Sequence, residues 1–558
     1  MAGVRARLPG HRLGWTIPAA AAAALIVLPV AVVVADGLTP TAEVWRRLWA
    51  TNLAEMVTTT LVLLVAVAFG TLLLGGGLAW LVTAYRFPGR SLFGWLLILP
   101  LAMPAYILGF VFLSLLDYPG PIQTTLRSVF GPHVWFPDVR SVAGAAAVLT
   151  LTLYPYVYLL ARSALTEQAA ATFEAARVLG AGRLRAARRV VLPMARPSLA
   201  AGLTLVMMET LTDFATVQYF NVQTVSVGVY QVWKGMFQRE AATELAGLVL
   251  VFAVAVIVAE RGLRGRARYH QRGGRGRGLP AAALTGIRGW AAAGVCVAVL
   301  AAAFLIPLAQ LLSWSGARGI RGIAGVFDTR LLTYFANSAL VAALAAAGCV
   351  GVGLLVANAA RLGGGRFTGA VAQLSTVGYA VPGVVVAIGV LTTFSALDEV
   401  LEGIGVSGGT GLLVTSSLVG ILYAYVVRFA ALGYTSVDAS LQKITPAMTM
   451  SALTLGAPPR RVLYRVHVPL ARAGVGVAFV LVLIDAIKEL PIVLLLRPFG
   501  FTTLSIWVYE LASESRWSDA GLPALAIVAA ALVPVLVLFR PATAGRVPVD
   551  AEKAGVVR

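Results

Sequence analysis

Residues 180–202 read GAGRLRAARRVVLPMARPSLAAG, and residues 456–478 read GAPPRRVLYRVHVPLARAGVGVA. The two stretches align without a gap, so that Gly180 matches Gly456 and Pro193 matches Pro469. Self-similarity between two such distant stretches indicates a duplicated chain, in which each copy is one structural unit.

Two further pairs of segments support the duplication. AMPAYILG around Pro104 recurs as YAVPGVVVAIG around Pro382, at nearly the same spacing. YPYVYLLA from Tyr154 recurs as YAYVVRFA from Tyr423, at a shorter spacing. The shorter spacing predicts that the second copy carries seven extra residues, about SLQKITP at 440–446, before its loop.

The composition indicates a membrane protein. Of 558 residues, 59% are hydrophobic and 12% are charged, whereas soluble proteins carry about 25% charged residues. The two cysteines, Cys296 and Cys349, lie in separate apolar runs, and the four histidines are far apart. We therefore expect neither a disulfide framework nor a metal cage.

Twelve windows are apolar enough to cross a bilayer, which takes about 20 residues per helix. An apolar run after the basic N-terminus resembles a signal peptide but lacks a clear cleavage site, so we expect an uncleaved first span. The predicted spans are 15–35, 57–84, 92–116, 142–163, 198–220, 243–260, 289–313, 335–360, 368–396, 410–433, 473–496 and 521–539.

The basic residues predict that both termini are cytoplasmic. With the N-terminus inside, cytoplasmic segments hold 32 of the 44 Lys and Arg residues, six of them from Arg428 to Arg472. Six acidic residues on the same side give +26, and the rest of the chain sums to −6. The net charge of +20 thus follows the positive-inside rule, and we expect no nucleic-acid partner.

The predicted fold is an all-α polytopic membrane protein of about 12 transmembrane helices. An even number of spans per copy makes the two six-helix repeats parallel. The first half is 1–260 with a long loop at 167–196, and the second half is 289–540 with a loop at 443–472. A Gly/Arg-rich linker at 261–288 joins them, and 541–558 is a cytoplasmic tail. An RNA-binding arm is the alternative use of the linker.

The first long loop carries a recognisable motif. Glu174, Ala175 and Ala176 begin a helix-forming segment, Gly180 interrupts it, and Pro193 follows. Two short helices with a bend at Gly180 are expected. The pattern resembles the EAA loop of bacterial ABC-importer permeases of the type I, MetI-like fold. This resemblance implies that these residues form a coupling helix that docks on a separate ATP-binding subunit.

The second loop departs from that pattern. Met450 and Ser451 replace the first two motif residues, while Ala452, Gly456 and Pro469 keep the frame. We expect asymmetric docking of the two loops. No GxxxxGK[ST] phosphate loop occurs, so the chain is predicted to be no enzyme and to bind no cofactor itself, with ATP and Mg on the partner.

Five charged residues fall inside the fifth and eleventh spans. Glu209 and Asp213 are four apart, on one helix face, and they match Asp485 and Glu489 in the second half, where Lys488 is added. The carboxylates either hold neighbouring helices together or line a path for a cation, without binding a metal tightly. Proton coupling is a third use of such groups.

Several features of the second half resemble the fused permeases of ferric-iron ABC importers. They are the fusion itself, the seven-residue extension, KELP at 488–491 and LLLRPF at 494–499. The resemblance implies inward iron transport across the bacterial inner membrane, with two ATP-binding subunits and an extracytoplasmic substrate-binding protein. Relatives of the same fold import thiamine, polyamines or oxyanions. A duplicated membrane scaffold or enzyme is the alternative of another class, although no catalytic arrangement is evident.

Overall fold

The computed structural model describes residues 13–38, 41–167, 170–236, 239–264, 281–316, 328–363, 365–406, 410 and 417–538. In this part of the chain, twelve helical segments are long and apolar enough to cross a membrane, as predicted. The C-terminal tail, residues 265–280 of the linker and the basic N-terminal residues lie outside the described ranges.

The first half is a run of helices with three short π-helical segments (η1, η3 and η4) and one short 3₁₀ segment (η2) in the described residues. Its elements are α1 (Leu13–Gly37), α2 (Ala42–Ala50), α3 (Leu53–Thr71), η1 (Leu72–Gly76), α4 (Gly77–Ala84), α5 (Arg90–Leu96), η2 (Leu99–Ala102), α6 (Ala105–Leu116), α7 (Pro121–Phe130), α8 (Val142–Glu167), α9 (Ala170–Val178), α10 (Arg183–Ala186), η3 (Ala187–Val191), α11 (Leu192–Thr212), α12 (Ala215–Tyr219), α13 (Val225–Gln231), η4 (Val232–Met236) and α14 (Arg239–Arg264).

The second half repeats much of this order. Its elements are α15 (Ile287–Leu300), η5 (Ala301–Leu305), α16 (Ile306–Gly316), α18 (Thr329–Gly363), α19 (Arg366–Leu374), η6 (Val377–Ala380), α20 (Gly383–Gly403), α21 (Leu418–Leu441), α22 (Pro446–Thr454), α23 (Pro459–Val462), η8 (Leu463–His467), α24 (Val468–Lys488), α25 (Pro491–Leu496), α26 (Leu504–Ser513) and α27 (Trp517–Leu538).

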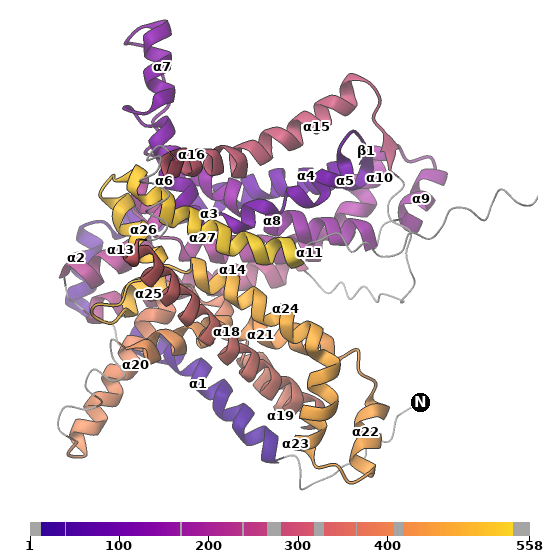
Figure 1. Cartoon of the computed structure of the whole chain (residues 1–558), viewed down its shortest axis with the longest axis vertical. Coiled ribbons are helices and arrows are strands. Elements are labelled where there is room, and N and C mark those ends of the chain that lie inside the picture. The colour runs from indigo at the N-terminus through magenta and orange to yellow at the C-terminus, as the bar shows by residue number, and fades with distance from the viewer. Residues whose placement is uncertain are drawn as a thin grey trace, which may run out of the picture.

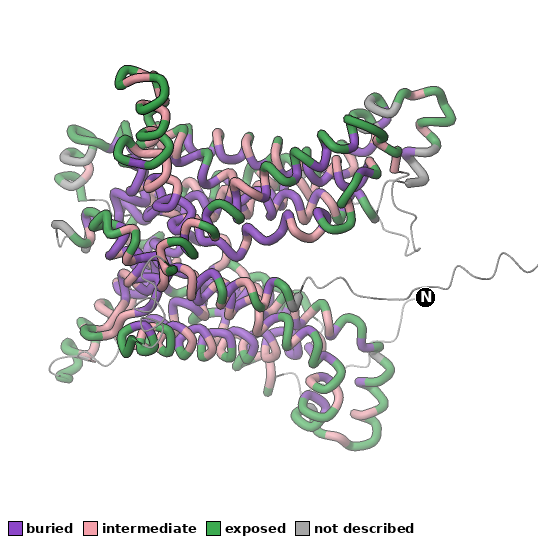
Figure 2. The backbone as a smooth tube through the Cα atoms, turned by 45° about the horizontal axis from the view of Figure 1, so that its top comes forward, coloured by how far each residue is buried: buried purple, intermediate pink, exposed green. Residues whose placement is uncertain are grey.

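The two helical bundles meet at one end and diverge at the other (Figures 1 and 2). The meeting end carries α13, α25 and α26, and the diverging end carries α9 and α22 (Figure 1). Outward faces of the spans are apolar and exposed: along α3 and η1, side chains at a spacing of four are 47–67% exposed, namely Leu61, Val65, Phe69 and Leu73. Such a stripe suits contact with lipid rather than water.

The first span of each half packs on the opposite half. Helix α1 packs against α18, α19 and α20, and the hydroxyl of Tyr423 donates a hydrogen bond to the Leu25 carbonyl at 2.6 Å. The seventh span lies along the first half (Figure 1), where the rings of Phe110 and Trp314 stack with centroids 6.1 Å apart. Strand β2 (Ala282–Ala283), at the end of the linker, pairs in parallel with β1 (Tyr85–Arg86) of the first half. The seventh span follows directly, so that each half places its first span against the other half; we call this the exchange of first spans.

Prolines break two of the predicted spans. Windows 92–116 and 368–396 were expected to be continuous helices, but the chain bends at Met103 and Val381, which adopt extended conformations with ψ of 109° and 129°. Each precedes a proline, Pro104 or Pro382, whose ring disfavours the helical conformation of the residue before it. The two prolines match in the duplicated sequence, so the breaks belong to the repeat.

The tyrosine segments at 154–161 and 423–430 are not equivalent, and the predicted seven-residue extension is wrong. Helix α8 begins at Val142 and α21 at Leu418, and α9 begins at Ala170 and α22 at Pro446. Both pairs have the spacing that separates Pro193 from Pro469, so no extra residues lie between them. A shift of about two helical turns keeps the same face of the helix and produces a false match. One point of likeness to the iron permeases is thereby lost.

Candidate transport cavity and coupling loops

The fifth and eleventh spans end where their acidic residues lie. Helix α11 stops at Thr212 and α24 at Lys488, and the next residues, Asp213 and Glu489, are extended with ψ of 108° and 126°. The predicted spans 198–220 and 473–496 therefore run past the ends of these helices, which begin earlier than predicted. Helix interruptions at membrane depth are tolerated only within protein or around a cavity.

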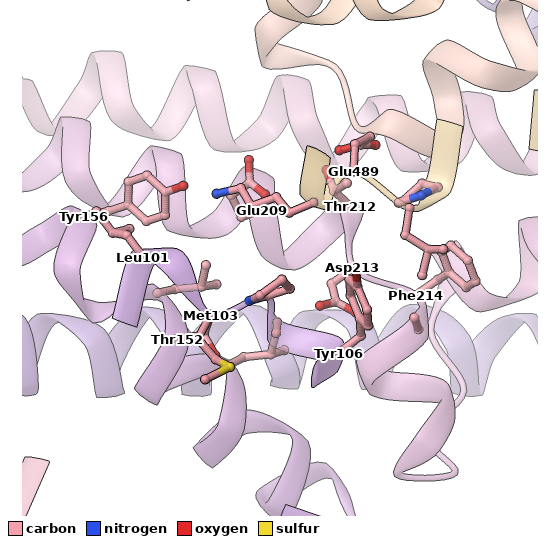
Figure 3. A pocket seen from close by; sticks show the side chains of 18 residues that line it. Leu101, Met103, Tyr106, Thr152, Tyr156, Glu209, Thr212, Asp213, Phe214 and Glu489 are labelled. Carbon is pink, nitrogen blue, oxygen red and sulfur yellow. The ribbon is translucent and has the colours of Figure 1, made fainter. Parts of the chain in front are cut away.

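A cavity of about 100 Å³ lies at these helix ends. Three segments of the first half and one of the second line it (Figure 3). The lining residues are Leu101, Met103, Pro104, Ala105 and Tyr106 around the start of α6; Leu149, Thr152, Leu153 and Tyr156 of α8; Glu209, Thr212, Asp213, Phe214 and Ala215 around the end of α11; and Lys488, Glu489, Leu490 and Pro491 around the end of α24.

Asp213 is held by the helix that follows it. Its carboxylate accepts hydrogen bonds from the backbone N–H of Thr216 at 2.8 Å and from the hydroxyl of the same residue at 2.6 Å. The first of these bonds stabilises the start of α12, because it satisfies a backbone N–H of the first turn that lacks a helical partner. Asp213 therefore has a structural task in addition to its place in the cavity wall.

Glu489 is buried beside the cavity with one oxygen unsatisfied. It is 8% exposed, and its Oε1 atom accepts no hydrogen bond among the described residues. The hydroxyl of Tyr106, in the facing wall, likewise has no hydrogen-bond partner within the described chain. Buried polar atoms are rarely left in this state, so each invites a functional explanation.

The position of Arg428 differs from the one predicted from the sequence. This arginine was counted with the cytoplasmic basic residues, but it lies within α21 and is 4% exposed. Its Nη2 is 3.5 Å from Glu209 Oε1, and its Nε is 3.7 Å from Glu489 Oε2. The cytoplasmic count falls to 31 of 44, which leaves the charge bias unchanged in sign. An arginine inside the apolar segment YAYVVRFA was the signal, because such residues are rare at membrane depth.

The remaining predicted pathway residues form a local pair. Lys488 Nζ lies 2.8 Å from Asp485 Oδ1, one helical turn earlier in α24. The structure thus brings Glu209, Asp213, Lys488 and Glu489 to the cavity, whereas Asp485 contacts it only through Lys488. Within the described residues, no three His, Cys, Asp or Glu side chains are grouped so that they could hold a metal ion.

The two long loops have matching backbones. In the first, α9 and α10 flank Gly180 with φ +82°, and in the second, α22 and α23 flank Gly456 with φ +81°. Positive φ is readily adopted only by glycine. The π-helical turns η3 and η8 follow at matching positions of the repeat, just before Pro193 and Pro469. A proline has no N–H to donate, so these turns accommodate the interrupted helical hydrogen bonding.

The two loops differ in the contacts that hold them against the membrane spans. Around α22, Arg361 Nη1 donates to the Leu441 carbonyl at 2.6 Å and its Nη2 to the Ile444 carbonyl at 2.6 Å. His467 lies between Asn358 Oδ1 at 2.9 Å and Thr449 Oγ1 at 3.0 Å. In the alignment of the two halves, His467 and Thr449 correspond to Val191 and Phe173, both apolar and buried.

A family model matches this architecture. Residues 71–260 match the binding-protein-dependent transport system inner membrane component. The chain is also 31% identical, over 211 residues, to a probable molybdenum ABC transporter permease of Haloferax volcanii, a match that covers 38% of this chain and 72% of the relative. The chain belongs to the ABC-importer permease family.

Other relatives of this permease differ in what their names say they carry. It is 26% identical over 503 residues to an Fe(3+)-transport system permease of Haemophilus influenzae, covering 90% of this chain and 92% of the relative. It is 29% identical over 198 residues to the sulfate permease of Salmonella typhimurium, covering 34% and 68%. The match to the iron permease thus includes both halves.

In this permease, the residues predicted for ATPase coupling occupy the loop helices and their flanks. Ala175 and Gly180 are exposed in the first loop, and Gly456 and Pro469 are exposed in the second, while Ala176, Pro193 and Ala452 are half-buried. Glu174 lies in α9, but its side chain lies outside the described positions. Exposure leaves the exposed residues free to meet a partner, and the coupling role of the whole set stays a prediction.

Proposed function

We propose that this permease moves ferric iron inward by alternating access, driven by ATP hydrolysis in separate subunits. The observation that carries the proposal is the chemistry of the cavity. Three carboxylates, from Glu209, Asp213 and Glu489, and two phenols, from Tyr106 and Tyr156, line it. Oxygen donors of this kind suit a hard metal cation.

The charge balance favours a cation over an oxyanion. Lys488 is the cationic residue in the cavity wall, and Asp485 already pairs with it at 2.8 Å. Two like charges about 4 Å apart repel by about 4 kcal/mol at an effective dielectric constant near 20. Sulfate or molybdate would therefore meet net repulsion in this cavity, whereas a cation would be attracted.

The cavity suits transient passage rather than storage. Two of its carboxylates already have partners, since Asp213 accepts hydrogen bonds from Thr216 and Glu209 lies beside Arg428. A transported ion must leave as readily as it arrives, so incomplete coordination serves transport better than a closed cage.

The loops supply the expected sites for the partners. Helices α9 and α22 lie at the end where the halves diverge (Figure 1), and we assign this end to the cytoplasm from the positive-inside bias. Two ATP-binding subunits would dock there, and a substrate-binding protein would dock at the opposite end. Both termini are then cytoplasmic, and the divergent halves correspond to an inward-facing state.

Uptake by the reconstituted importer tests the proposal. The permease, its ATP-binding subunits and its binding protein are placed in proteoliposomes and offered labelled ferric iron, molybdate, sulfate, thiamine or a polyamine. We expect ATP-dependent accumulation of iron that persists with an uncoupler. Accumulation of an oxyanion without iron would overturn the substrate assignment, and uptake that collapses with the uncoupler at constant ATP would indicate proton coupling. Failure to recover an ATP-binding subunit with the chain would favour a scaffold.

A further inference from the structure

The strongest unexplained feature is the buried guanidinium between the two halves. Arg428 belongs to α21 of the second half, yet its Nη2 approaches Glu209 of the first half at 3.5 Å. Its Nη1 also lies 3.4 Å from the Thr212 hydroxyl, again in the first half, and donates to the Val381 carbonyl of its own half at 3.2 Å. This side chain therefore connects the halves at the depth of the cavity.

We propose that Arg428 is a resident counter-cation, which an incoming multivalent cation displaces from Glu489 and Glu209. Displacement would remove a charged contact between the halves and so link occupancy of the cavity to their separation. The inference rests on the proposed function only in taking the ligand to be a cation, whatever its identity.

The pairing in the present state is incomplete. Arg428 Nε is 3.7 Å from Glu489 Oε2, beyond hydrogen-bond distance, and it has no hydrogen-bond partner among the described residues. Glu489 Oε1 and the Tyr106 hydroxyl are also unpartnered there, and both residues line the cavity. A buried polar group without a partner costs about 1–3 kcal/mol. A cation bound in the cavity would offer a partner to these oxygens.

The charges of the cluster favour displacement of Arg428 by a multivalent cation. One guanidinium faces two carboxylates, Glu209 and Glu489, and so leaves one negative charge uncompensated. A trivalent cation brings more charge to the same carboxylates. The guanidinium and the cation would repel each other at such a distance, so the two are alternatives rather than joint occupants.

The buried arginine occurs in only one of the two repeated halves. In the alignment of the two halves, Arg428 corresponds to Thr152, a neutral residue in the cavity wall. The second half therefore contributes the competing cation, which has no counterpart in the first. Gly383 permits the close approach, because a Cβ at this position would lie 2.7 Å from Glu489 Oε1 and 3.1 Å from Arg428 Nη1.

Cation binding by the purified full-length permease tests the competition. Ga³⁺, a hard trivalent ion that is not readily reduced, is titrated into the protein in nanodiscs by calorimetry. We expect R428Q to bind Ga³⁺ at least tenfold more tightly than the wild type. E489Q should bind no more tightly than the wild type, and the double variant R428Q/E489Q should lose the gain that R428Q shows. Arg497→Gln is the matched control, because Arg497 and its partner Glu510 both lie outside the cavity wall. The Ga³⁺ affinity of this variant should equal that of the wild type.

The distance between the halves provides an independent measurement. Spin labels at Ala175→Cys and Ser451→Cys, both exposed loop positions, report the separation of α9 and α22. Ga³⁺ should change the distance distribution of the wild type, and R428Q should show the changed distribution without Ga³⁺.

Two outcomes would overturn the proposal: unchanged or weaker Ga³⁺ binding by R428Q, or no change in the distances. If R428Q does not fold, R428K replaces it. The lysine keeps the charge but loses the fork that reaches both carboxylates, so we expect intermediate affinity, and wild-type affinity would contradict us. If R428Q gains Ga³⁺ binding but the importer does not carry iron, only the substrate assignment fails.

Discussion

The Nε2 atom of His467, at the base of the eleventh span, lies 3.0 Å from the hydroxyl oxygen of Thr449 in the second loop helix. The same ring contacts Asn358 of α18 at 2.9 Å through Nδ1. Hydrogen bonds therefore link α18 and the base of the eleventh span to α22, whereas the corresponding positions of the first loop are the buried apolar side chains of Phe173 and Val191.

Replacing this imidazole should loosen the second loop specifically. His467→Leu removes both contacts and leaves the buried Thr449 and Asn358 short of a partner, at a cost of about 1–3 kcal/mol. We expect a lower midpoint of thermal unfolding and weaker stimulation of the partner ATPase. His133→Leu, at an exposed position, should change neither, and equal effects of the two variants would contradict this role.

The two loops should differ in the contribution of their motif residues. Glu174→Ala removes a carboxylate that the motif implies for docking, whereas Met450→Ala removes no charge. We therefore expect Glu174→Ala to cost more coupled ATPase activity, measured with the reconstituted subunits. Equal losses would count against asymmetric docking.

The glycine turns of the two loops should tolerate asparagine better than alanine. Gly180 and Gly456 have φ of +82° and +81°, and no atom lies within 4 Å of a Cβ placed on either one. The cost of Gly180→Ala or Gly456→Ala is then the left-handed backbone alone, about 1–2 kcal/mol. We expect reduced ATPase coupling for alanine and partial recovery for asparagine. Gly182→Ala, which has equal space and no positive φ, is the control.

A methyl group at Gly383 should disturb the charge cluster without removing a charge. Gly383→Ala places a Cβ 2.7 Å from Glu489 Oε1, and overpacking of this kind costs about 1–3 kcal/mol. We expect a clear loss of transport, measured as uptake by proteoliposomes, in protein that still assembles. Gly351→Ala, in α18 with open space around it, should transport normally. Normal transport by Gly383→Ala would show that the cluster can shift freely.

Hydropathy and repetition were sufficient to predict the twelve spans and the duplicated plan, because both depend on local composition. They could not predict where the helices break, since Asp213 and Glu489 lie in segments that remain apolar beyond the break. The equivalence of Tyr154 and Tyr423 failed because a shift of about two turns preserves a helix face.

The network around Arg428 could not be predicted from the sequence for a different reason. Glu209 lies 219 residues before it in the chain, and Glu489 follows the end of another helix of the second half. Only the packing of three helices from both halves brings these side chains together. Glu209 and Glu489 were recognised as candidates, but Arg428, which pairs with both, was counted with the cytoplasmic basic residues although it falls inside the predicted span 410–433.

The exchange of first spans has a consequence for how the chain is made. Helix α1 ends at Gly37, and the first helix of the opposite half that it contacts, α18, begins at Thr329. At about 5–20 residues per second, a ribosome takes roughly 15–60 s to cover that interval. Throughout this period the neighbours of α1 in the opposite half do not exist, while the seventh span finds its neighbours in the first half, α5, α6 and α8, already made. Assembly of the two bundles is therefore ordered in time, although their finished architecture is nearly symmetric.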